Sequence, residues 1–525
     1  MKVRNEMMKS ERENAIIHRF EKLVPDGNYG RLGTTFETAH KKYFFDTGTG
    51  KVFDCESVEY DAFKQLFERN SIEAVLNDNV GNSNLCDAYE KILNMVEKEH
   101  ILRAPKYENF VQLSEENLKI LVEQDLQQVI LELTEKCNLR CKYCIYNEYN
   151  PAYRNFTTRD MDWDVAKKAI DYTYAHSGKK IAVTFYGGEP LVKFDLMKKC
   201  IEYSKSIMQD KELTFSFSTN LTLMTREIAR YVASVDGCSV LCSLDGPKVI
   251  QDSYRVKVDG TGTFEQAIQG LRYLVEEMGE SAKNRIIINT VVCPPYTKEK
   301  LDMIQKFFDD LDWLPKELEK KCDYVEGGTI RDEDIAVDFL NGKDITEKYQ
   351  KQELDSIRSW ALDNILNNED KKGYALGINK DNLVKIHNRM LTDTPDLRLG
   401  RNGCCVPGNR RIYVQVDGNF LACEKIGDSP SIGNVFTGID IKQIRKYYME
   451  EYDQKSIKRC SNCWAVNLCG ICYATCYVKE GLDINIKDNA CEYQRKQAKG
   501  ELMAYYQLLE DKPAEIEKIK DIPIM

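Results

Sequence analysis

Apolar positions in the central part of the chain form short runs, and longer stretches with helical spacing separate them. The runs have the length of buried strands, and they fall at 129–133, 181–186, 213–218, 239–244 and 286–292. Between them, apolar residues repeat at helical spacing over 163–176, 195–209 and 263–277. Repeated strand–helix units predict a parallel sheet, so we expect an α/β core over residues 125–325, open or closed into a barrel.

The segment before this core has a different pattern. Residues 1–35 are charged and predict a loosely docked arm. Residues 36–110 combine a hairpin, whose turn falls at 47–50, with helices at 59–68 and 85–102. A short hairpin packed on helices resembles a winged-helix unit.

Three further segments follow the core. Residues 326–400 are charged and contain helical stretches at 352–366 and 381–391, so we interpret them as a helical bridge or insertion. Residues 401–495 are rich in cysteine and short of long helices. Residues 496–525 predict a helix that ends near Asp511, followed by a tail.

Composition narrows the classes of function. The chain has 525 residues, of which 42% are hydrophobic and 30% charged. Its net charge of −10 argues against a nucleic-acid surface, which needs clustered Lys and Arg. No apolar run approaches the ~18 residues of a membrane helix, and the charged N-terminus lacks an apolar secretion signal. We therefore expect a cytoplasmic protein whose partners include neither nucleic acid nor membrane.

Nineteen cysteines set this chain apart. In a long cytosolic chain, such a number indicates metal binding more often than disulfides. Three cysteines fall at 137–144 and nine between 404 and 491. The other seven are isolated, and we interpret them as buried, unreactive thiols: Cys55, Cys86, Cys200, Cys238, Cys242, Cys293 and Cys322.

The first cysteine group has the spacing C-x3-C-x2-C in the stretch CNLRCKYC, directly after the first apolar run. A [4Fe–4S] cube held by Cys137, Cys141 and Cys144 would keep one of its four irons open to a non-protein ligand. Zinc and three cysteines without a metal are the alternatives. Structural zinc prefers four ligands, and this loop offers three. The spacing therefore favours redox chemistry at an iron–sulfur cluster.

A second motif follows the next strand. Gly187 and Gly188 would let the backbone approach a ligand closely, because neither carries a Cβ. Glu189, followed by Pro190, could then bind an ammonium group. A Gly-Gly pair is usually only a turn, but its place one strand–helix unit after the cysteine loop makes the motif informative.

Together, CNLRCKYC and YGGEP resemble the radical S-adenosylmethionine enzymes, over about residues 127–300. The resemblance implies a partial (β/α)6 barrel in which Cys137, Cys141 and Cys144 hold the cluster, and the amino and carboxylate groups of S-adenosylmethionine chelate the open iron. It further implies that Tyr143 lies near the adenine. The segment from Gly187 to Pro190, including Gly188 and Glu189, would contact the methionine amino group.

Four strand-end residues are weaker candidates for cofactor contacts by the same resemblance: Ser218, Asn220, Ser243 and Asp245. Strand-end capping and turn formation are equally good interpretations of them. Arg255 could pair with a carboxylate or lie at the surface.

The chemistry that this resemblance implies is specific. A reduced cluster sends one electron into the sulfonium, the C–S bond breaks, and methionine and a 5′-deoxyadenosyl radical result. The radical then abstracts hydrogen from a substrate carbon. The cofactor supplies the difficult step and the protein orients it. The reducing electron would come from a donor such as flavodoxin or ferredoxin.

The C-terminal cysteines resemble the SPASM extension, which carries auxiliary [4Fe–4S] clusters in radical enzymes that modify peptides. The resemblance assigns Cys460, Cys463, Cys469 and Cys491 to a distal cluster. It assigns Cys405, Cys423 and one or both of Cys472 and Cys476 to a proximal cluster.

Some assignments in this block stay open. Tyr473 occupies a position where the family has a cysteine, and Cys404 competes with Cys405. Zinc held by the pairs Cys460–Cys463 and Cys469–Cys472 is the alternative. Glu424, next to Cys423, is a candidate proton acceptor or a solvated loop residue.

The N-terminal unit resembles the peptide-recognition element of peptide-maturing enzymes, where a leader peptide adds as a strand to a sheet edge. Residues 43–46 or 51–54 could form that edge; the alternative is a domain that only stabilises the barrel. We therefore hypothesise a maturase that forms a thioether in a ribosomally made, cysteine-containing peptide. Carbon–carbon cross-linking, sulfatase-type formylglycine formation and a non-catalytic iron–sulfur or zinc binding module are the alternatives.

Overall fold

The computed structural model describes residues 11–148, 150, 153–325, 330–331, 334, 354–367 and 373–517. Part of the expected arm (1–10), most of 326–353 in the expected bridge and the tail after 517 lie outside the described residues. In the described part of the chain, no helix is both long and apolar enough to cross a membrane.

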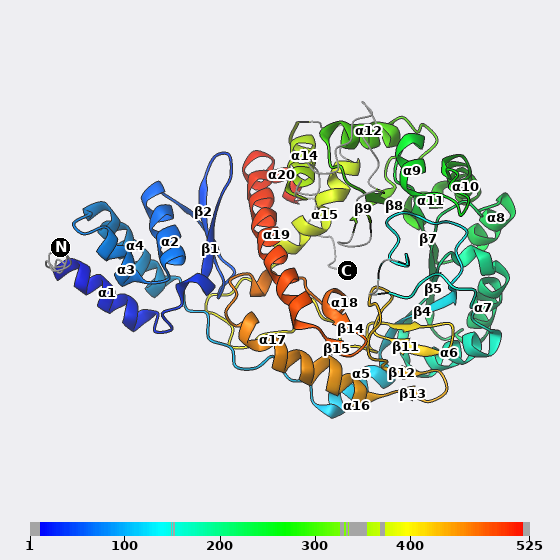
Figure 1. Cartoon of the computed structure of the whole chain (residues 1–525), viewed down its shortest axis with the longest axis horizontal. Coiled ribbons are helices and arrows are strands. Elements are labelled where there is room, and N and C mark those ends of the chain that lie inside the picture. Colours follow the sequence, from blue (N-terminus) through cyan, green and yellow to red (C-terminus); the bar gives the residue numbers. More distant parts are fainter. Residues whose placement is uncertain are drawn as a thin grey trace.

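The N-terminal unit packs a small antiparallel sheet against helices (Figure 1). Its elements are α1 (Glu11–Leu23), β1 (Gly33–Glu37), β2 (Lys42–Asp46), β3 (Val52–Cys55), α2 (Ser57–Arg69), α3 (Ile72–Asp78) and α4 (Ser83–Lys98). The rings of Phe44 and Phe63 stack at 4.0 Å in its core. Residues 11–35 are not the loosely docked arm that their charge predicts. Helix α1 buries Ile16 and Phe20 in the same core, and the charged residues around them obscured that face in the sequence.

The sheet of this unit has the order β1-β2-β3, and each neighbouring pair is antiparallel. The prediction of an open edge at 43–46 is wrong, because these residues lie in the central strand β2. The β1 side is covered by α19 (Ile484–Asp511), whose Tyr506 ring lies 5.6 Å from that of Phe36. Within the described residues β3 pairs only with β2, so 51–54 remains the candidate edge.

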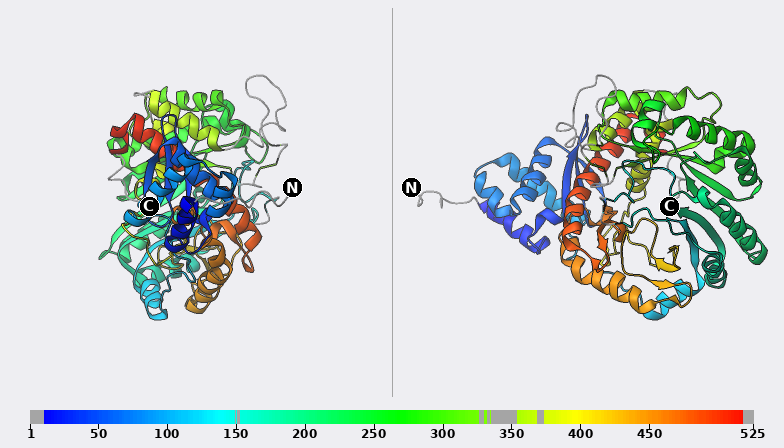
Figure 2. Two further views of the ribbon diagram at one scale, coloured as in Figure 1. Left: turned by 90° about the vertical axis from the view of Figure 1, so that its left-hand side faces the viewer. Right: turned by 45° about the vertical axis from the view of Figure 1, so that its right-hand side comes forward.

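The core sheet has six parallel strands in the order β4-β5-β6-β7-β8-β9. They are β4 (Leu126–Thr134), β5 (Ser177–Gly187), β6 (Glu212–Thr219), β7 (Cys238–Ser243), β8 (Ile286–Val292) and β9 (Glu319–Tyr324). Helices α6 (Trp163–His176), α7 (Phe194–Ile207), α8 (Arg226–Ser234), α9 (Lys248–Tyr254), α10 (Phe264–Met278), α11 (Ala282–Arg285) and α12 (Lys298–Asp309) connect them and cover the outer face of the curved sheet (Figure 2). The predicted partly closed α/β barrel is confirmed.

Alternation along the strands separates two faces of the sheet. Phe185, Phe215 and Phe217 are buried on the face that packs against the helices. The concave face is polar, since Gln128 donates to Thr184 at 2.7 Å and Thr184 shares a 2.8 Å hydrogen bond with Ser216. The inside of the barrel is therefore lined by polar groups.

The C-terminal segment extends the same sheet. Strand β10 (Ile412–Val414) pairs in parallel with β4, and β11 (Asn419–Leu421), β12 (Gly433–Asn434) and β13 (Gly438–Ile439) continue outward from it. This segment also contains long helices, contrary to our expectation. α16 (Ile441–Gln443), the π-helical η5 (Ile444–Glu451) and α17 (Tyr452–Cys460) run without a break, and α19 starts well before residue 496.

The remaining elements join these parts. α5 (Glu115–Gln124) precedes the barrel, and α14 (Leu354–Asn367) and α15 (Gly373–His387) form the described part of the bridge. The helix expected at 381–391 thus begins earlier and ends at His387. α18 (Tyr473–Cys476), β14 (Tyr477–Val478), β15 (Gly481–Leu482) and α20 (Pro513–Glu517) complete the chain. Figure 1 shows α19 lying between the N-terminal unit and the barrel.

Candidate functional site

The first cysteine loop begins where β4 ends, at the C-terminal edge of the parallel strands. Its backbone is fixed on two sides. Gly188 N–H donates to the Thr134 carbonyl and Glu189 N–H to the Lys136 carbonyl, each at 2.9 Å. On the other side, Lys142 N–H donates to the Tyr254 carbonyl at 2.9 Å. These bonds fix the loop against the residues that follow β5 and against the end of α9.

The three thiols of this loop are desolvated. Burial raises the pKa of Cys137 to about 12 and also raises the pKa values of Cys141 and Cys144. Leu139 N–H points at the Cys137 sulfur from 3.4 Å. Buried thiols become thiolates when a cationic metal centre binds them, so this donor set fits an iron–sulfur cluster.

The two glycines lie against the cysteine loop. Gly187 has a φ of +137°, in the region that favours glycine. A Cβ on Gly188 would lie 2.5 Å from the carbonyl carbon of Lys136 and 3.0 Å from the nitrogen of Cys137. The motif therefore sets how closely β5 approaches the residue before the first cysteine.

Glu189 is buried beside this contact. Its Oε1 accepts from Thr219 at 2.9 Å and from Leu191 N–H at 3.1 Å, and its Oε2 accepts from Asn220 N–H at 2.7 Å. Burial raises the pKa of Glu189 to about 7, although these hydrogen bonds oppose the rise. Pro190 starts the short 3₁₀ helix η2 (Pro190–Lys193), for which Glu189 is the N-cap.

The strand-end candidates differ in their surroundings. The Asn220 amide donates to Asn138 at 3.0 Å and lies 3.9 Å from the Cys137 sulfur. Its oxygen accepts from Thr222, so the residue also forms the expected turn. Ser218 and Ser243 are half-buried near the ends of β6 and β7.

Asp245 is the centre of a buried ionic cluster next to the cysteine loop. It accepts a hydrogen bond from the Tyr143 hydroxyl at 2.5 Å and from Arg255 Nε at 2.9 Å. The guanidinium of Arg255 also lies 5.3 Å from the centre of the Tyr143 ring. Arg255 is only 6% exposed. It therefore pairs with a carboxylate, as the first of the two interpretations holds, and does not lie at the surface.

Sequence reasoning gave no role beside this cluster to Cys293, Tyr254 or Lys300. Cys293 and Tyr254 are buried beside Tyr143, and Lys300 donates to the Cys293 carbonyl at 2.7 Å. Burial lowers the pKa of Lys300 to about 8. Lysine and cysteine at such spacing carry no motif, so only the fold could bring them here.

Four C-terminal thiols lie within electrostatic range of one another. Burial raises the pKa of Cys460 to about 12, with added contributions from the nearby Cys469, Cys491 and Cys463. Burial also raises the pKa of Cys469, and the nearby Cys463 and Cys491 add to that rise. These four cysteines lie on α17, the following loop and α19.

A second group surrounds Cys472. Burial raises the pKa values of Cys405 and Cys423, and Cys472 contributes to each rise. Cys472 likewise contributes to the raised pKa values of Cys404 and Cys476. The structure thus brings both members of the Cys404–Cys405 pair near Cys472.

Buried polar atoms occur next in sequence to members of the first group. Within the part of the chain that the structure describes, the hydroxyls of Ser456 and Ser461 and the amide nitrogen of Gln494 are buried without a hydrogen-bond partner. Ser461 follows Cys460, and Gln494 lies one turn after Cys491. Such donors fit the acceptor sulfurs of an iron–sulfur cluster. Among the described residues, no three His, Cys, Asp or Glu side chains converge on one point as a single metal ion requires.

Glu424 has a specific partner. Both of its oxygens lie within hydrogen-bond distance of Arg411 Nη1, at 2.9 and 3.0 Å. The side chain is 13% exposed, so it is not the solvated loop residue considered above.

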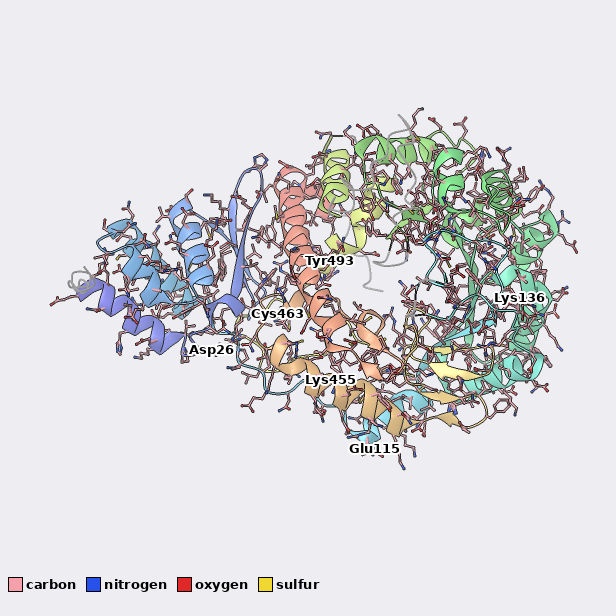
Figure 3. The ribbon with its side chains drawn as sticks, viewed as in Figure 1. Asp26, Glu115, Lys136, Lys455, Cys463 and Tyr493 are labelled. Atoms are coloured by element: carbon pink, nitrogen blue, oxygen red, sulfur yellow. The ribbon has the colours of Figure 1, made fainter. Side chains whose placement is uncertain are left out.

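The two cysteine regions occupy different parts of the molecule. In Figure 3, Lys136, next to Cys137, lies among the barrel elements, whereas Cys463 lies near α17 on the side of the N-terminal unit. The N-terminal unit contacts this second region directly. Thr47 donates to the Trp464 carbonyl and accepts from Asn467, both at 2.8 Å.

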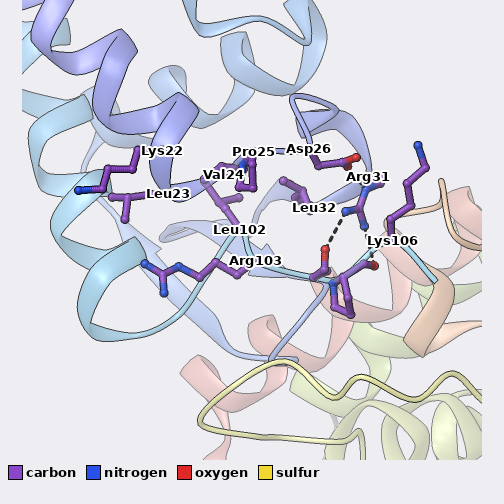
Figure 4. A pocket seen from close by; sticks show the side chains of 12 residues that line it. Lys22, Leu23, Val24, Pro25, Asp26, Arg31, Leu32, Leu102, Arg103 and Lys106 are labelled. Carbon is purple, nitrogen blue, oxygen red and sulfur yellow. Dashed lines mark hydrogen bonds and ion pairs between the residues drawn. The ribbon is translucent and has the colours of Figure 1, made fainter. Parts of the chain in front are cut away.

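A hollow of about 470 Å³ lies on the N-terminal unit, between the end of α1 and residues 102–106 (Figure 4). Lys22, Arg103 and Lys106 contribute cationic groups to its lining. Arg31 pairs with Asp26 and donates to the Ala104 carbonyl at 2.7 Å. The hollow is therefore positively charged in a chain whose net charge is −10.

Comparison with known proteins identifies the core. Residues 131–308 match the family model described as the radical SAM superfamily. The serine-type anaerobic sulfatase-maturating enzyme of Bacteroides thetaiotaomicron is 30% identical over 26% of this chain and 34% of its own length. The radical SAM cyclopropyl synthase TigE of Paramaledivibacter caminithermalis is 22% identical over 70% of this chain and 72% of its own length. The chain spans half or less of the length of several other curated relatives.

A solved structure described as native anSMEcpe with bound AdoMet shares the fold. It is similar with a TM-score of 0.53 at 18% identity, over 75% of this chain and 100% of that one.

Proposed function

Because residues 131–308 form a radical SAM domain, we propose that this protein is a peptide maturase that forms a thioether in a ribosomally made, cysteine-containing precursor peptide. One observation in particular supports a peptide substrate. A three-stranded unit, whose β3 edge is unpaired among the described residues, packs directly onto the segment that follows Cys463, through Thr47, Trp464 and Asn467. A peptide held at that edge would be close to the cysteine-rich region.

The radical SAM superfamily uses a [4Fe–4S] cluster and S-adenosylmethionine, and these supply the reducing electron and the radical that abstracts hydrogen. In this chain Cys137, Cys141 and Cys144 would hold the cluster, and Gly187, Gly188 and the Glu189 carboxylate would lie beside the cofactor. The buried hydrogen bonds to Glu189 orient it to accept N–H groups from the methionine end.

The ionic cluster around Asp245 orients Tyr143. The carboxylate receives both the Tyr143 hydroxyl and the Arg255 guanidinium, so the ring of Tyr143 is fixed on one side of the cysteine loop. Fixing a ring at this point would define the adenine side of the cofactor site, and it would also exclude water from the reacting centre.

The C-terminal cysteines would hold two auxiliary clusters of the SPASM type. We assign Cys460, Cys463, Cys469 and Cys491 to the distal one. We assign Cys405, Cys423, Cys472 and either Cys404 or Cys476 to the proximal one. The orphaned hydroxyls of Ser456 and Ser461 support a cluster at the distal group.

The overall change is an oxidation. A substrate C–H bond and a cysteine S–H bond break and a C–S bond forms; one hydrogen atom leaves with the adenosyl group, and one proton and one electron leave separately. An auxiliary cluster would accept that electron. Glu424, paired with Arg411, is the candidate for the proton. We place this reaction in the cytoplasm, with flavodoxin or ferredoxin as electron donor.

Strand β3 would receive the leader segment of the peptide. Asp46 N–H donates to the Lys51 carbonyl, so hydrogen-bonded pairs alternate along the hairpin and the backbone groups of Val52 and Asp54 point away from β2. A proline at 54 would remove an outward N–H, whereas alanine would keep it. We expect Asp54→Pro to weaken binding of the precursor and Asp54→Ala to leave it unchanged. Equal affinities for the two variants would argue against this edge.

Two other reactions have support from the comparisons. The similarity to a cyclopropyl synthase favours carbon–carbon bond formation as the second candidate. The similarity to sulfatase-maturating enzymes favours formylglycine formation as the third. Solved structures of native anSMEcpe that hold a peptide together with AdoMet also support a peptide substrate.

Mass spectrometry of a cysteine-containing precursor peptide, co-expressed anaerobically with this protein, tests the proposal. A thioether predicts a loss of two hydrogens together with the loss of one thiol that iodoacetamide can alkylate. A loss of two hydrogens with all thiols still alkylated would support a carbon–carbon bond instead. No 5′-deoxyadenosine on reduction with S-adenosylmethionine would favour the non-catalytic binding module.

A further inference from the structure

Lys487 is a buried cation in the cysteine-rich region. It lies on α19 with no measurable exposure, and its ammonium donates to the Tyr452 hydroxyl at 3.2 Å. The same nitrogen lies 4.7 Å from the centre of the Tyr452 ring. A buried lysine normally loses its proton or pairs with a carboxylate. In the described part of the chain, no carboxylate forms an ion pair with it.

Hydrogen bonds and helix packing link this ammonium to cysteines of both groups. The Tyr452 hydroxyl that it contacts donates to Asn402 Oδ1 at 2.9 Å, and the Cys460 thiol donates to the same oxygen at 3.5 Å. Helix α18, which ends at Cys476, packs against α19. Burial acts to lower the pKa of Lys487, and nearby cysteines of both groups, Cys460 and Cys476 among them, raise it.

Two helices fix this position. Lys487 and Cys491 are one turn apart on α19, so their side chains share a face. Tyr452 and Cys460 lie about two turns apart on α17, and both are buried. The lysine is thus held at the contact between the helices that carry the cysteines.

Three other cations of this region pair with carboxylates. Arg401 donates to both oxygens of Asp453, at 2.7 and 2.8 Å. Lys455 pairs with Glu451, and Arg459 pairs with Asp488. Their charges are largely neutralised, whereas the buried Lys487 has no such ion pair among the described residues.

We propose that Lys487 is a positioning residue shared by the two auxiliary iron–sulfur clusters, and that its ammonium raises their reduction potentials. This inference rests on the proposed auxiliary clusters. A cluster held by cysteinates is anionic and gains one further negative charge on reduction. A fixed cation in a desolvated site favours the reduced form, so the clusters become better acceptors for the electron that leaves the substrate.

Redox titration followed by electron paramagnetic resonance tests this. The Cys137→Ala, Cys141→Ala and Cys144→Ala changes remove the N-terminal cluster, so only auxiliary signals remain. Lys487→Met keeps length and removes the charge, and Lys487→Arg keeps the charge. Lys458→Met is the matched control, since Lys458 is an exposed lysine two residues from Cys460.

We expect the midpoint potentials to become more negative in Lys487→Met, and to stay near the parent values in Lys487→Arg and Lys458→Met. Unchanged potentials in Lys487→Met with full iron content would overturn the inference. If Lys487→Met loses its auxiliary iron while Lys487→Arg keeps it, the charge is needed to hold the clusters, which supports the inference. Loss of iron in both variants would show a steric role and refute it. Absence of auxiliary iron from the parent protein would instead contradict the proposed function.

Discussion

Replacing Gly188 with alanine should displace the first cysteine loop. The added Cβ would lie 2.5 Å from the Lys136 carbonyl carbon, closer still to its oxygen, and 3.0 Å from the nitrogen of Cys137. Carbon atoms in contact prefer about 3.5–4.0 Å, so β5 and the loop must separate by about 1 Å. The atoms in the way belong to the backbone of the cysteine loop, which is hydrogen-bonded on both sides. Unlike a side chain, this backbone cannot rotate away.

Overpacking of this kind costs about 1–3 kcal/mol, and 1.4 kcal/mol is a factor of ten in an equilibrium constant. We therefore expect the N-terminal site of Gly188→Ala to bind its cluster roughly tenfold or more weakly. Anaerobic reconstitution followed by iron and sulfide analysis measures this. The variant should lose about four irons per chain while the C-terminal sites keep theirs. Formation of 5′-deoxyadenosine should fall in parallel.

Gly178→Ala is the matched control in the same strand. A Cβ there would meet Asp125 Oδ1 at 3.4 Å and the Gln124 carbonyl oxygen at 3.8 Å, which are ordinary contacts. It should retain iron and activity. If Gly188→Ala also retains both at wild-type levels, the close approach of the glycine motif to the cysteine loop does not matter for the cluster.

The same geometry leads to three other expectations. Because the raised pKa of Glu189 is about 7, its carboxylate takes up a proton below that pH and loses the negative charge that favours an ammonium donor. Anaerobic calorimetry should therefore show S-adenosylmethionine binding about tenfold weaker at pH 6 than at pH 8, and no such dependence in Glu189→Gln. Asp245→Asn would leave Arg255 buried without its ion-pair partner and should lower the free energy of unfolding by about 3 kcal/mol, whereas the exposed Glu265→Gln should change it by less than about 0.5 kcal/mol; equal denaturation midpoints would contradict this. Cys460→Ala combined with Cys491→Ala should remove about four irons and leave the signal of the N-terminal cluster; loss of every cluster would contradict two separate sites.

Much of the core could be predicted because it depends on local pattern. Strands β4 to β8 fall where short apolar runs predict them, since each is buried on the helix-covered face. The cysteine spacing and the GGEP motif are also local, and they indicated the radical SAM domain that the family model identifies.

The rest depends on contacts between distant residues. Strand β10 is only three residues long, and its place beside β4 could not be inferred from its own sequence. Strand β9 reads Glu-Lys-Lys-Cys-Asp-Tyr and has no apolar alternation. The burial of Arg255, the contact of Lys300 with Cys293 and the position of Lys487 among cysteines arise only when the barrel and the C-terminal helices pack.

Cleavage of S-adenosylmethionine by the reduced protein tests the central claim most directly. Anaerobically reconstituted wild type, given dithionite and S-adenosylmethionine, should yield 5′-deoxyadenosine. The protein with Cys137, Cys141 and Cys144 all changed to alanine should yield none, and we expect it to keep the proposed C-terminal iron. Continued formation of 5′-deoxyadenosine by that variant would contradict the account.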